Sequence, residues 1–262
     1  MGAVIGDRDL SRFRQEYYAL TSLLFLRQPT EEALKLLATG SDERAEGAVH
    51  LNQELARGWK AIGRALKELA ENPAATLEKA VEEYNELFGG LVPPLTPCES
   101  LYLTGKLFGT PLAAIRNLMN RIGLEKSPEY PEPEDHIGFL AEIMRQLILR
   151  QEAAKDPDEE TKWLNYQGDL LKGHLSRWVP RFCDDLEKAE RADLYAGVAK
   201  LLRGLMHLEA ELLAEWGSAQ PEHILQIKVK EKDFTGPLFD PAQFEAQGLQ
   251  EKGPPEPPEK TP

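Results

Sequence analysis

Cysteine, positive charge and long apolar runs are all scarce in this chain. Only Cys98 and Cys183 occur among 262 residues, which excludes a disulfide framework and a zinc finger. The 44 acidic residues outnumber the 31 basic ones, and the net charge of −13 argues against a nonspecific nucleic-acid binder or a protein held on anionic lipid. The longest apolar run near the start, Leu23–Leu26, is too short to span a bilayer, and no secretory leader is visible. We therefore expect a soluble, cytoplasmic protein with no nucleic-acid partner and no stable membrane insertion.

Sequence motifs for catalysis and metal binding are also missing. The chain has no glycine-rich dinucleotide motif, no Walker A loop and no Gly-x-Ser-x-Gly elbow. None of the five histidines belongs to a Glu-x-x-His or His-Glu-x-x-His pattern. His207 and Glu211 share a helical face, but one such pair without partners favours a surface role. We predict no catalytic residue and no metal site.

Apolar residues recur at helical spacing through most of the chain. The stripes lie within residues 13–24, 51–69, 77–88, 112–122, 137–148, 163–178 and 194–213. Thr110 followed by Pro111 predicts a helix start, Gly123 predicts its end, and Pro180 predicts a stop or kink. Strand signals are scarce, and the best one covers Ile224–Val229. The pattern predicts an all-α fold, with a single helical-bundle domain over residues 1–217.

The composition changes after Trp216. Gly-Pro and Asp-Pro pairs appear, and residues 253–258 read Gly-Pro-Pro-Glu-Pro-Pro. Such a stretch buries too little apolar surface to offset the loss of chain entropy on ordering. We therefore expect an extended C-terminal arm over residues 218–247 and a disordered Pro/Glu-rich tail over residues 248–262.

Two non-helical segments, residues 89–100 and 126–134, interrupt the helical domain, and such loops commonly carry function. The second leads into a dense group that runs from Glu132 through Pro133 to His136. Pro133 suits a first helical turn, which would place Glu134, Asp135 and His136 near the positive end of the helix dipole. The group is either an ordinary acidic helix start or an acceptor and a switchable donor for one bound chain.

His174 has two interpretations as well. It lies on an apolar face with Leu170, Leu171 and Trp178, which is typical of a hydrogen-bonded core histidine. Alternatively, it ties its helix to a neighbouring loop.

Three segments together resemble one protein family. Tyr84–Phe88 with Pro93–Ser100 resembles an aromatic-x-x-Leu-Phe helix end that runs into a proline-rich loop closing with Pro-x-x-Ser. Residues 132–140 resemble a Glu-Pro-x-Asp-His helix start, and residues 174–182 resemble a His-Leu-x-x-Trp-x-Pro-x-Phe segment. Order and approximate spacing match the TorD/DmsD/NarJ family of molybdoenzyme assembly chaperones. Cys98 is a departure, because the family loop often has tyrosine there.

The resemblance implies an all-helical TorD-like fold and no catalysis. Family members bind the apo catalytic subunit of a molybdopterin-dependent oxidoreductase, often through its twin-arginine signal peptide, and hold it in the cytoplasm until the molybdenum cofactor is inserted. The chaperone itself carries no cofactor; weak GTP binding has been suggested for the family, but no phosphate-binding loop is visible here. The resemblance does not choose between a monomer and a homodimer.

A groove for such a peptide needs carboxylates at one end and apolar walls beyond them. Only the Asp135–His136 position is carried over directly from the family; the division into a charged end and an apolar wall is an inference. The charged end is assigned to Glu132, Glu134 and Asp135, and the wall to Tyr84, Leu87, Phe88, Leu91 and Leu95. The predicted partner-binding set is Tyr84, Glu86, Leu87, Phe88, Pro97, Ser100, Glu132, Glu134, Asp135 and His136.

Two other functions stay open at this point. One is a helical scaffold or assembly subunit that remains in a redox complex, and the other is a small helical nucleotide-binding enzyme. For the chaperone, replacing Asp135 or His136 with alanine is expected to weaken partner binding and to leave the melting temperature nearly unchanged. Replacing Trp178, expected in the core, should instead destabilise the fold.

Overall fold

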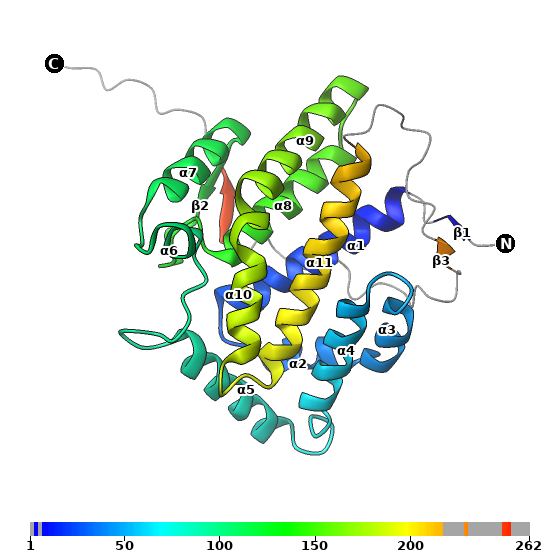
Figure 1. Cartoon of the computed structure of the whole chain (residues 1–262), viewed down its shortest axis with the longest axis vertical. Helices are drawn as coiled ribbons and strands as arrows, with labels where there is room; N and C mark the ends of the chain where they lie inside the picture. The colour runs from blue at the N-terminus through cyan, green and yellow to red at the C-terminus, as the bar shows by residue number, and fades with distance from the viewer. Residues whose placement is uncertain (1–2, 5–6, 217–227, 230–247, 253–262) are drawn as a thin grey trace.

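The computed structural model describes residues 3–4, 7–216, 228–229 and 248–252, and these residues are mostly helical (Figure 1). The helices are α1 (Asp7–Leu26), α2 (Glu31–Ala38), α3 (Ser41–Ala48), α4 (Gln53–Ala65), α5 (Pro73–Phe88), α6 (Glu99–Thr104), α7 (Thr110–Ile122), α8 (Ile137–Glu152), α9 (Pro157–Leu170), the π-helical turn η1 (Leu171–Leu175), α10 (Ser176–Lys188) and α11 (Leu194–Trp216). The strands are β1 (Ala3–Val4), β2 (Leu124–Lys126), β3 (Lys228–Val229) and β4 (Leu249–Glu251). The predicted all-α fold is confirmed.

The helix ends follow ordinary capping chemistry. The Thr30 side chain accepts a hydrogen bond from the backbone N–H of Ala33 at the start of α2, at 3.2 Å. Gly123 ends α7 in the left-handed conformation, with φ of 71°, as its position in the sequence predicts. The predicted start of α7 is wrong by one residue, because the extended residue before the helix is Gly109 and Thr110 is already helical.

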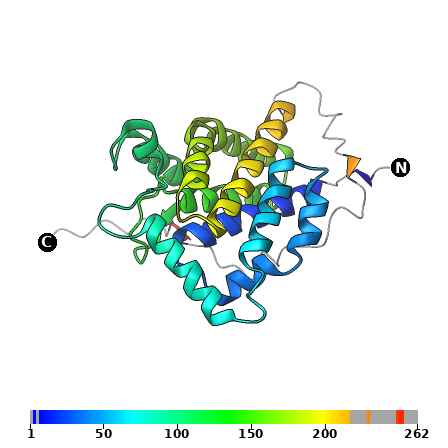
Figure 2. The ribbon, with the colours of Figure 1, turned by 60° about the horizontal axis from the view of Figure 1, so that its bottom comes forward.

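Helix α1 runs through the middle of the bundle and packs along α8, while α11 packs along α4 and α10 (Figures 1 and 2). Two glycines let α4 and α11 approach closely. A Cβ atom on Gly58 would lie 2.7 Å from a Leu201 side-chain carbon, and one on Gly204 would lie 2.7 Å from Leu55. Larger residues at either glycine would therefore push the two helices apart.

Helix α10 corrects one prediction. It continues through Pro180, where the sequence predicts a stop or kink, and the irregular backbone lies just before it in η1. A helical proline loses the hydrogen bond to the residue four positions earlier and crowds that carbonyl. For Pro180 that residue is Ser176, which directly follows η1, so the wider π turn adjoins the place where the ladder is interrupted.

Two short antiparallel pairings involve the C-terminal part of the chain: β1 with β3, and β2 with β4. Of the predicted strand at Ile224–Val229, only β3 lies within the described residues. The predicted disordered tail is wrong for residues 248–252. There Leu249 is buried and the backbone pairs with β2, an effect of tertiary contact that composition does not reveal. The other residues of the predicted arm and tail lie outside the described ones.

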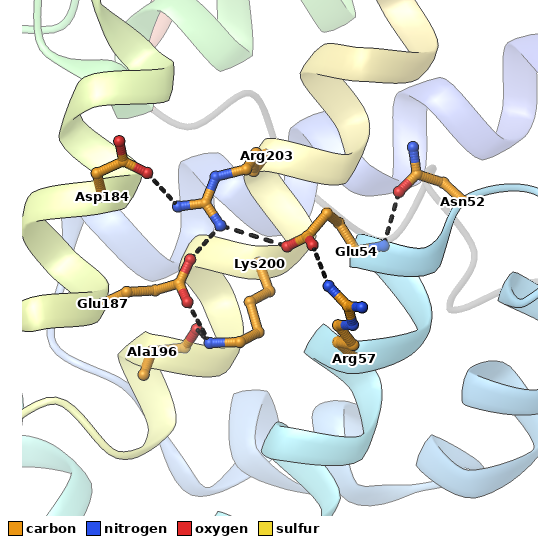
Figure 3. Close-up of polar contacts among 8 residues, drawn as sticks. All are labelled: Asn52, Glu54, Arg57, Asp184, Glu187, Ala196, Lys200 and Arg203. Carbon is orange, nitrogen blue, oxygen red and sulfur yellow. Dashed lines mark hydrogen bonds and ion pairs between the residues drawn. The ribbon is translucent and has the colours of Figure 1, made fainter.

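Ion pairs join several helices. Arg14 of α1 binds Glu209 of α11 through two hydrogen bonds of 2.6 and 2.8 Å, and both side chains are buried. On α11, Arg203 contacts Glu54 of α4 at 3.3 Å, Asp184 of α10 at 2.8 Å, and Glu187 of α10 (Figure 3). We call these four residues the Arg203 network.

In the part of the chain that the structure describes, no helix is both long and apolar enough to cross a membrane.

Candidate functional site

Two loops that are distant in the sequence meet at the start of α6 and of α8. The backbone N–H of Ile137 donates to the carbonyl of Pro97 at 2.8 Å, and the N–H of Glu99 donates to the carbonyl of Asp135 at 3.0 Å. Between these contacts, Cys98 and His136 form an antiparallel bridge. We call residues 97–100 together with residues 134–137 the α6–α8 junction. It unites two of the three segments that carry the family resemblance.

The carboxylate of Asp135 is fully buried in this junction. Its Oδ2 accepts a hydrogen bond of 2.8 Å from the backbone N–H of Ser100, one of the free donors in the first turn of α6. The hydroxyl of Ser100 in turn accepts from the N–H of Gly109 at 3.1 Å, which ties the start of α7 to the same place. The other oxygen, Asp135 Oδ1, has no hydrogen-bond partner among the described residues. A buried carboxylate oxygen in this state retains unused capacity to accept a donor.

His136 caps α8 rather than lying inside it. Its Nδ1 accepts from the backbone N–H of Gly138 at 3.2 Å, and α8 begins at Ile137. The prediction that Glu134, Asp135 and His136 lie in the first helical turn is therefore wrong. Pro133, read as a helix start, instead belongs to the loop, where its carbonyl accepts from the N–H of His136. Burial lowers the pKa of His136 to about 3, so its imidazole is neutral at physiological pH.

The acidic residues before His136 differ in what they contact. Glu134 binds Arg116 of α7 through two hydrogen bonds of 2.9 Å, so its charge is already matched. Glu132 has one carboxylate oxygen, Oε2, that is buried without a partner in the described structure. Burial and the negative charge of Glu132 raise the pKa of Tyr84 to about 12, which places Glu132 near α5. Of the three acidic residues just before His136, Glu132 and Asp135 thus have unused buried oxygens.

The buried thiol of Cys98 is affected by both of these carboxylates. Burial, with the charges of Asp135 and Glu132, raises the pKa of its thiol well above the ordinary value. A thiol held in the neutral form is a poor nucleophile, so Cys98 acts as a small buried side chain in this loop.

His174 ties its helix to Glu99, which the sequence places in a loop and the structure places at the start of α6. Its Nδ1 lies 2.8 Å from Oε2 of Glu99, a fully buried residue at the start of α6. The other oxygen of Glu99 and the indole N–H of Trp178 are buried without partners among the described residues. This contact joins the third resembling segment to the α6–α8 junction. Glu99 is absent from the predicted partner-binding set, although it lies inside the loop motif Pro93–Ser100.

The predicted apolar wall is mostly part of the core. Leu87 is buried, and the ring of Phe88 contacts those of Phe25 and Tyr195 at centroid distances of 5.6 and 5.2 Å. Tyr84 contacts Phe88 and donates a hydrogen bond to a carbonyl of α1, that of Phe25. Glu86 pairs with Arg191 at 3.4 Å. Among the predicted wall residues, Leu91 alone is fully exposed.

Exposed apolar side chains gather instead in two loops that flank α6. Leu91 and Val92 lie before it, and Leu107 and Phe108 lie after it. Figure 1 shows both loops on the same side of the molecule. Phe108 has a φ of 60°, a strained conformation for a bulky residue, and its ring is exposed. The sequence signal for this second pair was the apolar Leu-Phe dipeptide inside the loop Gly105–Gly109.

The described residues contain no group of three or more histidine, cysteine or acidic side chains arranged to hold a metal ion. What the site offers is a set of buried acceptors beside exposed apolar loops. This arrangement suits the binding of a chain that carries cationic and apolar groups.

Comparison with known proteins identifies the family. The family described as nitrate reductase delta subunit matches residues 50–184, just over half of the chain. A chaperone protein TorD from Aeromonas salmonicida is 30% identical over 113 residues, which cover 43% of this chain and only 53% of that protein. Longer matches join 79% of this chain to chaperone protein TorD from Vibrio cholerae, at 24% identity over 94% of that protein, and from Aliivibrio fischeri, at 25% identity over 98%. The chain therefore belongs to the nitrate reductase delta subunit family and is of the TorD type, a molybdoenzyme assembly chaperone and not an enzyme.

Proposed function

We propose that this protein acts in the cytoplasm, where it binds the apo catalytic subunit of a molybdopterin-dependent oxidoreductase and holds it until the molybdenum cofactor is inserted. Support comes from membership of the family and from chaperone relatives that match along most of their length. The cofactor belongs to the client, so the chaperone contributes binding surface only.

The observation that carries the proposed site is the pair of unused buried oxygens, Asp135 Oδ1 and Glu132 Oε2. A guanidinium group presents five N–H donors in a planar fork, and hydrogen bonds to carboxylates are among the stronger ones in proteins. An arginine of the client, such as one from a twin-arginine signal peptide, would supply the missing donors. Its approach requires a small opening of the loop over residues 127–134, because Asp135 is fully buried.

The apolar stretch that follows the arginines would lie on the exposed loops beside α6. Leu91 and Val92 belong to the loop that ends at Pro97, and the carbonyl of Pro97 accepts from the N–H of Ile137, so this loop adjoins the segment that holds Asp135. Leu107 and Phe108 extend this apolar surface on the other side of α6. Covering these side chains on binding would add a hydrophobic contribution to the affinity.

The test begins with an affinity pull-down from the native host, grown without oxygen, followed by identification of the bound proteins by mass. Recovery of a molybdoenzyme catalytic subunit that lacks its cofactor supports the proposal and names the client. Recovery of no such subunit would overturn it.

The site is then tested with the purified client. Glu132→Gln is expected to weaken binding about tenfold, the cost of one charge-assisted hydrogen bond. The matched control is Glu129→Gln in the same loop, where the carboxylate is exposed and contacts Ser127. Equal losses in the two variants would show that only general negative charge matters.

A retained subunit is the second candidate function, because the family description itself names a delta subunit. The two functions differ in the state of the bound enzyme. Co-purification with a mature, cofactor-loaded complex would favour a retained subunit over a chaperone that leaves.

A further inference from the structure

The C-terminal strand β4 is joined to the loop that carries Glu132. Its residues Leu249, Gln250 and Glu251 pair in antiparallel register with Lys126, Glu125 and Leu124 of β2. The pairing is extended at both ends: the N–H of Ser127 donates to the carbonyl of Gly248 at 2.7 Å, and the N–H of Lys252 donates to the carbonyl of Gly123 at 2.9 Å. Among the described residues, β4 is the one strand that pairs with β2.

The residues around the start of β4 fit Gly248 and Leu249 closely. Gly248 has a φ of 70°, and a Cβ atom there would lie 2.6 Å from the Phe139 ring and 3.1 Å from the Tyr130 ring. Leu249 beside it is only 5% exposed. Since a larger residue would meet both the strained backbone and two aromatic rings, glycine is required at position 248.

Polar side chains hold the edges of the strand. Gln250 donates to Glu125 at 2.9 Å, and Lys252 donates to Asn120 at 2.8 Å. Arg150 of α8 pairs with Glu251. These contacts are exposed or partly exposed, so each adds little to the hold on β4, which depends mainly on the backbone pairing and on Gly248 and Leu249.

The connection from β2 to the candidate site runs through Lys126. This residue stands opposite Leu249, and its ammonium group donates to the carbonyls of Tyr130 and Glu132 at 2.9 and 2.8 Å. Tyr130, whose carbonyl Lys126 binds, is itself buried against Phe139. The register of β2 therefore decides where the backbone of Glu132 lies.

We propose that β4 is a positioning element for partner recognition: by fixing Lys126 it holds Glu132 where its carboxylate can accept donors from a cationic segment of the client. This rests on the proposed function, and it assigns part of the specificity to residues more than a hundred positions away in the chain. Without β4, β2 loses its partner strand, so Lys126 is held less firmly and the carboxylate of Glu132 samples more positions.

The experiment compares the full chain with variants that end at residue 252 and at residue 247. The probe is a synthetic peptide with an Arg-Arg pair followed by an apolar stretch, and its matched control has Ala-Ala in place of the arginines. The variant ending at residue 252 is expected to bind both peptides as the full chain does. The variant ending at residue 247 is expected to bind the Arg-Arg peptide about tenfold more weakly, while binding of the Ala-Ala peptide stays unchanged.

A substitution gives the same test at full length. Gly248→Val should displace β4 and lower the affinity for the Arg-Arg peptide as the shorter variant does, whereas Gln250→Ala, at an exposed position, should not. A purely structural role of β4 would weaken the binding of both peptides together with the melting temperature. Unchanged or tighter binding of the Arg-Arg peptide without β4 would overturn the proposal, and tighter binding would show that β4 covers the site.

Amide hydrogen exchange keeps the inference separate from the proposed function. Exchange over residues 127–132 should become faster in the variant ending at residue 247 and not in the one ending at residue 252. If the full chain binds neither peptide, the proposed function fails at this site, and the exchange result still decides whether β4 orders the loop. Equal exchange in all three chains would refute the inference.

Discussion

The ion pairs that join the helices and the α6–α8 junction are both built from charged or polar side chains, but their acceptors are used differently. Arg203 donates to carboxylates from α4 and α10 (Figure 3). Arg14 donates to both oxygens of Glu209. At the junction, one oxygen of Asp135 accepts a hydrogen bond from the start of α6, and the other has no partner among the described residues. An unsatisfied buried acceptor costs about 1–3 kcal/mol, which a ligand that supplies a donor would recover. The comparison suggests that the first group stabilises the fold and that the second retains capacity for binding.

The largest effect is expected at the buried pair of Arg14 and Glu209. Arg14→Met should lower the free energy of unfolding by about 3–5 kcal/mol, because it leaves a buried carboxylate without a counter-charge. Urea denaturation measures this loss, and client binding by the folded fraction should not change. The double variant Arg14→Met with Glu209→Leu serves as the control and should regain most of the loss. A single variant as stable as the parent would contradict this account of the pair.

At Asp135, the effect on stability and the effect on client binding can be separated by the choice of substitution. Asp135→Ala should lower the free energy of unfolding by about 1–3 kcal/mol, because the N–H of Ser100 loses its acceptor. This revises the expectation of an unchanged melting temperature, which assumed an exposed side chain. Asp135→Asn retains an oxygen for Ser100 but removes the charge. It should therefore keep most of the stability while weakening client binding about tenfold.

The control for Asp135→Asn is Asp156→Asn. Asp156 caps α9 and accepts from the N–H of Glu159 at 2.8 Å, so its local chemistry resembles that of Asp135 without the junction. Calorimetric titration with the client should show no change for Asp156→Asn. If Asp135→Asn also binds with the parent affinity, the junction has a structural role only.

His136 makes the stability of the junction depend on pH between pH 7 and pH 5. Its pKa is lowered by burial to about 3 in the folded state, against an ordinary value of 6.5, so below pH 6.5 the unfolded chain binds the proton first. Stability from this residue is complete above pH 6.5 and is lost as the pH falls toward 3. Between pH 7 and pH 5 the loss should be about 1–2 kcal/mol.

The measurement is urea denaturation at both pH values. His136→Asn keeps a side chain that can cap α8 but does not titrate, so its stability should fall less than that of the parent. The control is His207→Asn at an exposed position of α11, and its stability should change between the two pH values as that of the parent does. If the free energy of unfolding falls equally in the parent and in His136→Asn between pH 7 and pH 5, the buried imidazole of His136 does not resist protonation.

The sequence predicts the helices well and the junction only in part. Apolar stripes at helical spacing identify α1, α5, α8 and α11, because each buries one face against the core. The sequence also predicts that His174 can join its helix to a neighbouring segment, but it does not identify Glu99 as the partner. The burial of Asp135 is not, since a motif of three charged residues reads as exposed until its tertiary contacts are known. The order of β4 is missed for the same reason, because its pairing with β2 joins residues more than a hundred positions apart.

The smallest effect is expected in the Arg203 network, where a substitution should lower stability slightly and leave client binding unchanged. Arg203 is 17% exposed and its partners are 20–55% exposed, so water screens these pairs more than it screens Arg14 and Glu209. Arg203→Met should lower the free energy of unfolding by about 1 kcal/mol, and the difference from the parent should shrink in 1 M salt.

Arg57→Met is the matched control, because Arg57 contacts Glu54 from a largely exposed position and its replacement should cost almost nothing. Client binding should be unaffected in both variants. A loss of binding without a loss of stability in Arg203→Met would mean that charges far from the junction also contact the client, and the division between the two groups would fail.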